Sequence, residues 1–255
     1  MKNAFSLVEL SIVLVILGLL TGGILSGQSL IRAAELRSVS SDYQKYITAT
    51  QGFRDKYFAL PGDMTNATAF WTSLAGNGAD STCQNAIPNG NATCNGNGDG
   101  VISLSNSNGV IESFRYWQHL SNAGLVEGSY NGQLGITLGL NLPKSKINSA
   151  SFYVFAGGGY IAGSTFGFGG DYGNNFYSFV NTVSGLPLKP EEAWNIDTKL
   201  DDGLPGGGRI YASKGDGTTI ICTTGDNLSP PADANATYVL SRTNKDCALN
   251  FLRVF

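Results

Sequence analysis

A run of 22 residues without a charge, Leu10 to Ile31, constrains this 255-residue chain more than any other feature. A helix needs about 20 such residues to cross the hydrocarbon core of a membrane. Lys2 lies before the run and Arg32 and Arg37 follow it, so the flanking charges say little about orientation. The run therefore predicts either a membrane-spanning helix or the apolar part of a signal peptide.

Glu9 argues against a conventional cleaved signal peptide. Its carboxylate directly precedes the uncharged run, at a position where a signal peptide is already apolar. No Ala-x-Ala cleavage pattern follows the run. A carboxylate within a membrane segment is costly, so its presence indicates a function.

The segment A-F-S-L-V-E-L at 4–10 resembles the processing signal of the type IV pilin and type II secretion pseudopilin superfamily. In that family a short basic leader ends in a small residue, usually Gly, and the mature chain has Phe first and Glu fifth. The resemblance implies cleavage between Ala4 and Phe5 and N-methylation of Phe5. It also implies an assembly role for Glu9, whose carboxylate would pair with the terminal amine of a neighbouring subunit. Ala4 departs from the usual Gly.

The same resemblance implies a location and partners. The precursor would be a single-pass inner-membrane protein with its head outside the cytoplasm. A prepilin peptidase/methyltransferase would process it, and an inner-membrane assembly platform would add it to copies of itself or to sister pilins. The product would be an extracellular type IV pilus or a periplasmic pseudopilus. The resemblance thus implies a structural subunit of a type IV pilus or a related filament. The alternatives are a type II secretion pseudopilin and a membrane-tethered surface-binding protein that does not assemble.

The helix is expected to continue beyond the membrane, because no proline occurs before Pro61. An aromatic-rich stripe with alternating spacings of three and four residues follows the uncharged run, at Leu36, Val39, Tyr43, Tyr46, Thr50, Phe53 and Tyr57. A helix over 5–58 would be roughly 80 Å long. The stripe favours packing against a β-sheet, and the alternative is two helices broken at the glycines between 18 and 27.

The remaining residues predict an α+β head, in which the long helix packs on an antiparallel β-sheet with long Gly/Asn-rich loops. Short helices are expected around 66–74 and over 111–123, with Gly124 ending the second. Runs rich in Tyr, Phe, Val and Ile predict strands at 151–156, 176–180, 209–212, 218–222, 237–241 and 249–254. The predicted divisions are a leader (1–4), a transmembrane or filament-core segment (5–31), an amphipathic helix half (32–58) and a globular head (59–255).

Four cysteines occur, none with C-x-x-C spacing. A head exported to an oxidising compartment is expected to form disulfides. Three pairings are possible. Pairing Cys83 with Cys94 and Cys222 with Cys247 closes the shortest loops and is the expected arrangement. A C-terminal loop closed by a disulfide also recurs in the family that the chain resembles.

The segment N-G-N-G-D-G-V-I at 95–102 resembles the start of a calcium-binding loop. Oxygen ligands at every second position, followed by a glycine, suit Ca²⁺. The candidate ligands are Asn95, Asn97, Asp99 and the backbone of Val101. The twelfth position is Asn106 where calcium loops have a bidentate Glu, so the alternative is a polar turn held by the Cys83–Cys94 bridge. No other cofactor is expected.

The sequence predicts no enzyme activity. It contains no G-x-S-x-G, H-E-x-x-H or nucleotide-binding loop, and its single histidine, His119, is expected to be a packing or surface residue. A net charge of −3 argues against nucleic acid as a partner. A second group of carboxylates consists of Asp197, Asp201, Asp202 and Asp216. We interpret it as a solvated turn, and the alternative is an ion-binding site.

Overall fold

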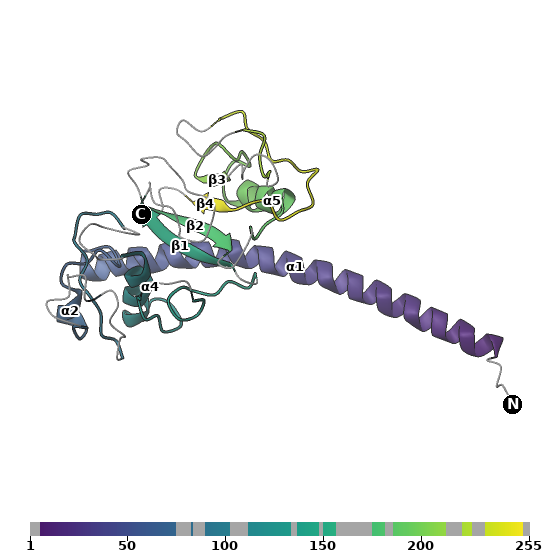
Figure 1. Cartoon of the computed structure of the whole chain (residues 1–255), viewed down its shortest axis with the longest axis horizontal. Coiled ribbons are helices and arrows are strands. Elements are labelled where there is room, and N and C mark those ends of the chain that lie inside the picture. Colours follow the sequence, from purple (N-terminus) through teal and green to yellow (C-terminus); the bar gives the residue numbers. More distant parts are fainter. Residues whose placement is uncertain are drawn as a thin grey trace.

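The structure is a computed structural model of the chain. It describes residues 6–74, 83, 90–102, 112–133, 137–147, 150–156, 175–181, 186–212, 221–225 and 233–251, with only the backbone described for 155, 156 and 175–181. Figure 1 shows a small head packed against the C-terminal half of one long helix, whose N-terminal half projects away from the head. The described elements confirm an α+β fold with a long apolar N-terminal helix and an antiparallel sheet.

The long helix α1 spans Leu7–Tyr57 without a break. It begins at Ser6, whose Oγ accepts a hydrogen bond from the Val8 backbone N–H at 3.2 Å. It ends at Phe58, which adopts a left-handed conformation with φ of 54° and whose N–H donates to the Arg54 carbonyl at 2.8 Å. The prediction of one continuous helix is therefore confirmed, and the alternative of two helices broken at the glycines is wrong.

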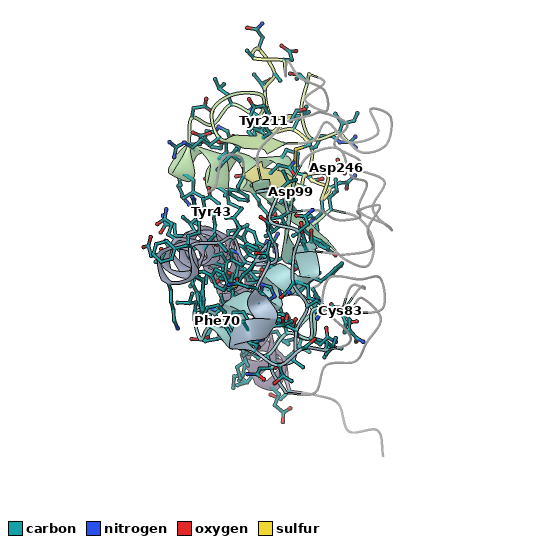
Figure 2. The ribbon with its side chains drawn as sticks, turned by 90° about the vertical axis from the view of Figure 1, so that its left-hand side faces the viewer. Tyr43, Phe70, Cys83, Asp99, Tyr211 and Asp246 are labelled. Carbon is teal, nitrogen blue, oxygen red and sulfur yellow. A yellow bond between two sulfur atoms is a disulfide. The ribbon has the colours of Figure 1, made fainter. Side chains whose placement is uncertain are left out.

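The predicted aromatic stripe is the face of α1 that meets the head. Tyr43 stacks on Phe251 of the sheet with ring centroids 4.3 Å apart, and Tyr46 packs edge-on against Trp117 at 4.8 Å. Figure 2, which views the molecule from the end opposite the N-terminus, shows Tyr43 between α1 and the sheet. Of the seven stripe residues, Val39, Tyr46, Thr50 and Phe53 are buried and Leu36, Tyr43 and Tyr57 are partly buried.

The sheet has four antiparallel strands in the order β1-β2-β4-β3. They are β1 (Ala150–Ala156), β2 (Asn175–Asn181), β3 (Ile210–Ala212) and β4 (Leu249–Phe251). Four of the predicted strands thus lie close to observed ones. The strand expected over 237–241 is wrong, since Tyr238 forms only an isolated bridge with Thr223 and a turn follows. The strand expected over 218–222 lies mostly outside the described residues, and its last residue, Cys222, is not in a strand.

Three shorter helices complete the described head: α2 (Ala67–Phe70), α4 (Glu112–Asn122) and α5 (Pro190–Leu200). The first two were expected, and Gly124 follows α4 with φ of 73°, as a helix-ending glycine should. The sequence analysis did not predict α5, which contains part of the segment interpreted as an acidic turn.

The turn after α1 depends on one glycine. Gly62 has φ of 85°, and a Cβ at this position would lie 2.5 Å from the Glu112 carbonyl oxygen of α4. A side chain would therefore clash with the backbone as well as strain the turn. This close approach brings the end of α1 against α4, where the Gly62 N–H donates to His119 Nδ1 at 2.9 Å.

Candidate functional site: the exposed half of α1 and the loop around Asp63

The N-terminal half of α1 is exposed along an almost entirely apolar surface. Ile16 and Leu17 near its middle are 50% and 52% exposed, and Leu30 near its end is 71% exposed. By length and composition this helix can cross a membrane, and a signal sequence near the N-terminus would have the same properties. The helix could therefore be a membrane anchor or a signal.

Glu9 has a local role that the sequence analysis missed. Its Oε2 accepts a hydrogen bond from the Ser6 backbone N–H at 2.9 Å, and with the Ser6 hydroxyl it completes a capping box at the start of α1. The signal for this arrangement was present in the sequence as Ser-x-x-Glu. The capping box directs the carboxylate back toward the helix start, next to the predicted cleavage point. Ala4 and Phe5 themselves lie outside the described residues.

The predicted calcium loop wraps around the carboxylate of Asp63, a residue that precedes the loop in the sequence. Asp63 is 5% exposed, and its Oδ1 accepts hydrogen bonds from the backbone N–H groups of Gly98 at 2.6 Å and Asp99 at 3.1 Å. Its Oδ2 accepts from the Gly100 N–H at 2.9 Å. Burial raises the pKa of Asp63, although these N–H donors oppose the shift. The loop is thus folded on an anion that is partly neutralised by backbone dipoles.

Asp63 also belongs to a group of three carboxylates with Asp99 and Glu112. One oxygen of each lies within 4.8 Å of the others, so together they could hold a hard divalent cation. Glu112 is fully buried, and its Oε1 accepts from the Asn97 N–H at 3.1 Å. The sequence analysis named neither Asp63 nor Glu112 as a ligand, because only the tertiary fold brings residues 63, 99 and 112 together.

The four predicted calcium ligands do not all meet. Asn95 Oδ1 accepts from the Thr68 backbone N–H at 2.9 Å and so contacts helix α2. Asn97 Oδ1 accepts from the Asp99 N–H at 3.0 Å, and its Nδ2 donates to Asp99 Oδ2 at 2.9 Å. The Val101 N–H donates to Asp99 Oδ1 at 2.8 Å. Asp99 is therefore the one predicted ligand that joins the three-carboxylate group.

A groove of about 750 Å³ opens beside this loop. One wall is formed by Gln51, Arg54 and Asp55 of the last turns of α1 and by Phe58, which ends the helix. The lining also includes Ala59, Leu60, Asp63, Thr65, Gly98 and Gly100. Phe58 is 93% exposed. Because Asp63 lines the groove, a cation bound by the three carboxylates would be within reach of solvent.

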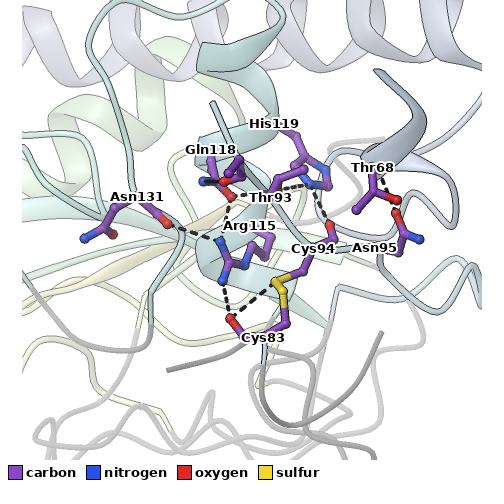
Figure 3. Close-up of a disulfide and its surroundings, with 10 residues drawn as sticks. Thr68, Cys83, Thr93, Cys94, Asn95, Arg115, Gln118, His119 and Asn131 are labelled. Atoms are coloured by element: carbon purple, nitrogen blue, oxygen red, sulfur yellow. Dashed lines mark hydrogen bonds between the residues drawn. A yellow bond between two sulfur atoms is a disulfide. The ribbon is translucent and has the colours of Figure 1, made fainter. Parts of the chain in front are cut away.

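Both expected cysteine pairs lie at disulfide-bonding distance, with Cα–Cα separations of 6.1 Å for Cys83–Cys94 and 5.0 Å for Cys222–Cys247. Figure 3 shows how the first pair is tied to helix α4 through Arg115. Arg115 is 2% exposed, and its Nη2 donates to the Cys83 carbonyl at 2.8 Å while Nη1 donates to Gln118 Oε1 at 2.8 Å. Burial lowers the pKa of Arg115 to about 10.

His119 is a buried packing residue. Its Nδ1 accepts the Gly62 N–H, so the ring proton lies on Nε2, which is 2.9 Å from Thr93 Oγ1 and 3.2 Å from the Cys94 carbonyl (Figure 3). Burial, with a smaller contribution from the charge of Arg115, lowers the pKa of His119 to about 3. The imidazole is therefore neutral at ordinary pH, in agreement with the expected structural role.

The second carboxylate group lies at the end of α5. Asp197, Asp201 and Asp202 each have an oxygen within 4.8 Å of the others, whereas Asp216 is outside the described residues. Asp202 is exposed, as a turn residue should be, but Asp197 is fully buried and accepts a hydrogen bond from the Tyr238 hydroxyl at 2.7 Å. Burial raises the pKa of Asp197 to about 7. The interpretation as a fully solvated turn is thus wrong for Asp197.

Comparison with known proteins adds no family to these observations. No protein-family model matches the chain, and neither a curated protein nor a solved structure matches it. The observations that bear on function are therefore the exposed apolar helix, the capping box at its start and the loop around Asp63.

Proposed function

We propose that this protein is a pilin-like structural subunit of a type IV pilus or a related filament. A prepilin peptidase would process it between Ala4 and Phe5, and the N-terminal half of α1 would join it to neighbouring subunits. The observation that carries the proposal is the continuous helix α1, which is exposed and apolar over one half and packed against the head over the other.

The architecture supports this proposal because the half of α1 that would join subunits is separate from the half that carries the head. The stripe from Leu36 to Tyr57 holds α1 to the head, so the projecting half is free to contact lipid or other copies. Apolar helices can exchange one apolar environment for another without exposing their surface to water. A subunit built in this way can move from a membrane into the core of a filament while its head remains folded.

In the proposed assembly, Glu9 pairs with the terminal amine of a neighbouring subunit and so distinguishes a subunit contact from a contact with lipid. Cleavage before Phe5 creates an amine four residues from Glu9, and the capping box holds the carboxylate near that end of the helix. In an apolar surrounding, deleting one member of an ion pair costs about 3–5 kcal/mol. Loss of the carboxylate would then weaken the contact with a neighbour's amine by roughly 100- to 1,000-fold or more.

The test compares Glu9→Ala with Glu9→Gln. Gln is accepted at this position of a capping box, so Glu9→Gln keeps the start of α1 intact and removes only the charge. Both variants should reach the membrane as abundantly as the wild type, since removing a carboxylate from an apolar segment does not oppose insertion. Both should also be deficient in sheared filaments and in photo-crosslinked dimers formed through a probe at Leu17.

The crosslink reports assembly whether the filament is a long pilus or a short pseudopilus. Normal assembly of both variants at equal membrane abundance would refute the pairing role and favour a membrane-tethered surface protein. A defect in Glu9→Ala alone would assign the effect to helix capping.

A further inference from the structure

An ion pair joins the head to α1 at the point where the exposed half of the helix begins. Arg32 Nε donates to Glu192 Oε1 at 2.6 Å and its Nη2 donates to Oε2 at 2.6 Å. Nη2 also donates to the Pro187 carbonyl at 3.2 Å, and Nη1 donates to Glu35 at 3.0 Å. Such a two-pronged guanidinium–carboxylate contact is among the strongest side-chain contacts in proteins.

The electrostatics agree with a permanent contact. Burial is the largest single influence on Glu192 and opposes its ionisation. The hydrogen bonds from Arg32 and from the Lys189 N–H, together with the charges of Arg32 and Lys189, outweigh burial and lower the pKa of the Glu192 carboxyl. Glu192 also accepts from the Lys189 backbone N–H at 2.9 Å, so its carboxylate caps the N-terminal end of α5. The N-terminal end of α5 is therefore held at the level of Arg32 along α1.

The length of the uncharged run indicates the depth at which Arg32 lies when α1 spans a membrane. The 22 residues from Leu10 to Ile31 extend about 33 Å as a helix, and the hydrocarbon core is about 30 Å thick. When the run fills the core, Arg32 lies where hydrocarbon meets the head groups. Glu192 must lie at the same depth because its carboxylate is 2.6 Å from the guanidinium.

The side chains next to this contact suit a head-group layer. Lys189 and Glu191 are exposed, and Trp194 is 38% exposed although it is a large aromatic residue. Trp194 follows Glu192 by two residues on the same helix, so its backbone lies within one turn of the contact with Arg32. Tryptophan is favoured at the boundary between membrane and water because its ring is apolar and its N–H is polar. Figure 1 shows α5 at the end of the head from which the exposed part of α1 projects.

We propose that this membrane-facing edge, formed by Lys189, Glu191 and Trp194 of the α5 region, contacts the phospholipid head groups while α1 is inserted. The Arg32–Glu192 pair is a positioning contact that holds the edge at that depth. The occupant is the lipid layer because the edge is continuous with the membrane segment of α1. The inference rests on the membrane-anchoring part of the proposed function.

Trp194 provides the measurement. The chain has three tryptophans, and the other two are 7% (Trp71) and 0% (Trp117) exposed. The full-length protein is reconstituted in phosphatidylcholine vesicles that carry a nitroxide either on the head group or near the end of an acyl chain. The emission of Trp194 is obtained as the difference between the wild type and Trp194→Phe.

The head-group nitroxide should quench Trp194 more than the deep nitroxide, and Trp194→Phe should lose most of that quenching. Arg32→Gln should reduce the quenching in protein that still floats with the vesicles. Unquenched Trp194 in floating protein would overturn the lipid contact while leaving the anchor intact. A blue shift without quenching that grows with protein density would overturn it in favour of a second copy. Failure to float would overturn the anchor and the inference together.

Discussion

Replacing Asp197 with Asn should change how the stability of the head depends on pH. Asp197 is fully buried on α5, where its Oδ2 accepts from the Tyr238 hydroxyl at 2.7 Å and its Oδ1 accepts from the Gly203 N–H at 3.3 Å. Burial raises its pKa from 3.8 to about 7, against the opposing effect of the Tyr238 hydrogen bond. Asn retains an acceptor oxygen for Tyr238 but does not titrate.

The sign follows from the protons bound in each state. Between about pH 4 and pH 7 the folded protein holds a proton on Asp197 that the unfolded chain has lost. The free energy of unfolding therefore falls as pH rises through this range. A shift of about three units corresponds to at most about 4 kcal/mol, fully lost above the folded-state pKa.

His119 acts in the opposite direction. Its pKa falls from 6.5 to about 3 on burial, so below about pH 6.5 the unfolded chain takes up a proton that the folded protein does not. The free energy of unfolding therefore falls as pH decreases from about 6.5 to 3. In the wild type the two effects on the free energy of unfolding partly cancel between about pH 4 and 6.5. In Asp197→Asn only the effect of His119 should remain.

The assay is urea unfolding of the full-length protein in detergent, followed by tryptophan emission from pH 4.5 to 8. At pH 8 the urea midpoint of Asp197→Asn should exceed that of the wild type by about 1–2 M, given the usual dependence of stability on urea. At pH 4.5 the two should nearly coincide. Asp55→Asn is the control, because Asp55 is exposed on α1 and is not among the charges that act on Asp197, so this variant should have the pH profile of the wild type. Parallel profiles for the wild type and Asp197→Asn would refute the reasoning.

Three further predictions concern the end of α1 and the Asp63 loop. Phe53→Ala should lower the free energy of unfolding by about 3–5 kcal/mol, because Phe53 is fully buried against the head, and a change below 1 kcal/mol in urea unfolding would contradict this. Phe58→Gly should raise the free energy of unfolding by roughly 1 kcal/mol, because glycine adopts the left-handed conformation of this position without strain. A lower free energy of unfolding in this variant would contradict the explanation. Millimolar calcium should raise the melting temperature relative to EDTA, and Asp99→Asn should abolish the increase; identical melting of the wild type in both conditions would exclude a stabilising calcium site.

Patterns that repeat along the chain predicted most of the described fold. The spacing of Val39, Tyr46 and Phe53 identified the face of α1 that packs on the head, because a helix places such residues on one side whatever they contact. Strands β1 and β2 were evident from runs of aromatic and branched residues. The run over 237–241 had the same composition but forms only one bridge, because strand formation also needs a partner along its length.

What the sequence did not predict depends on contacts between distant residues. Helix α5 begins with Pro190 and is capped by Glu192, which is a recognisable local signal, but its contact with α1 is made by Arg32, 160 residues earlier. The carboxylate group likewise joins Asp63, Asp99 and Glu112. No local pattern specifies such a group, so only one of its three members was among the expected ligands.

The most direct test of the proposed function is the mass of the N-terminal peptide of the protein isolated from its native host. A pilin-like subunit should begin at Phe5 and carry one added methyl group on its terminal amine, with the apolar segment that follows Glu9 intact. A chain that still begins at Met1, or one cut after the apolar segment, would contradict the assignment.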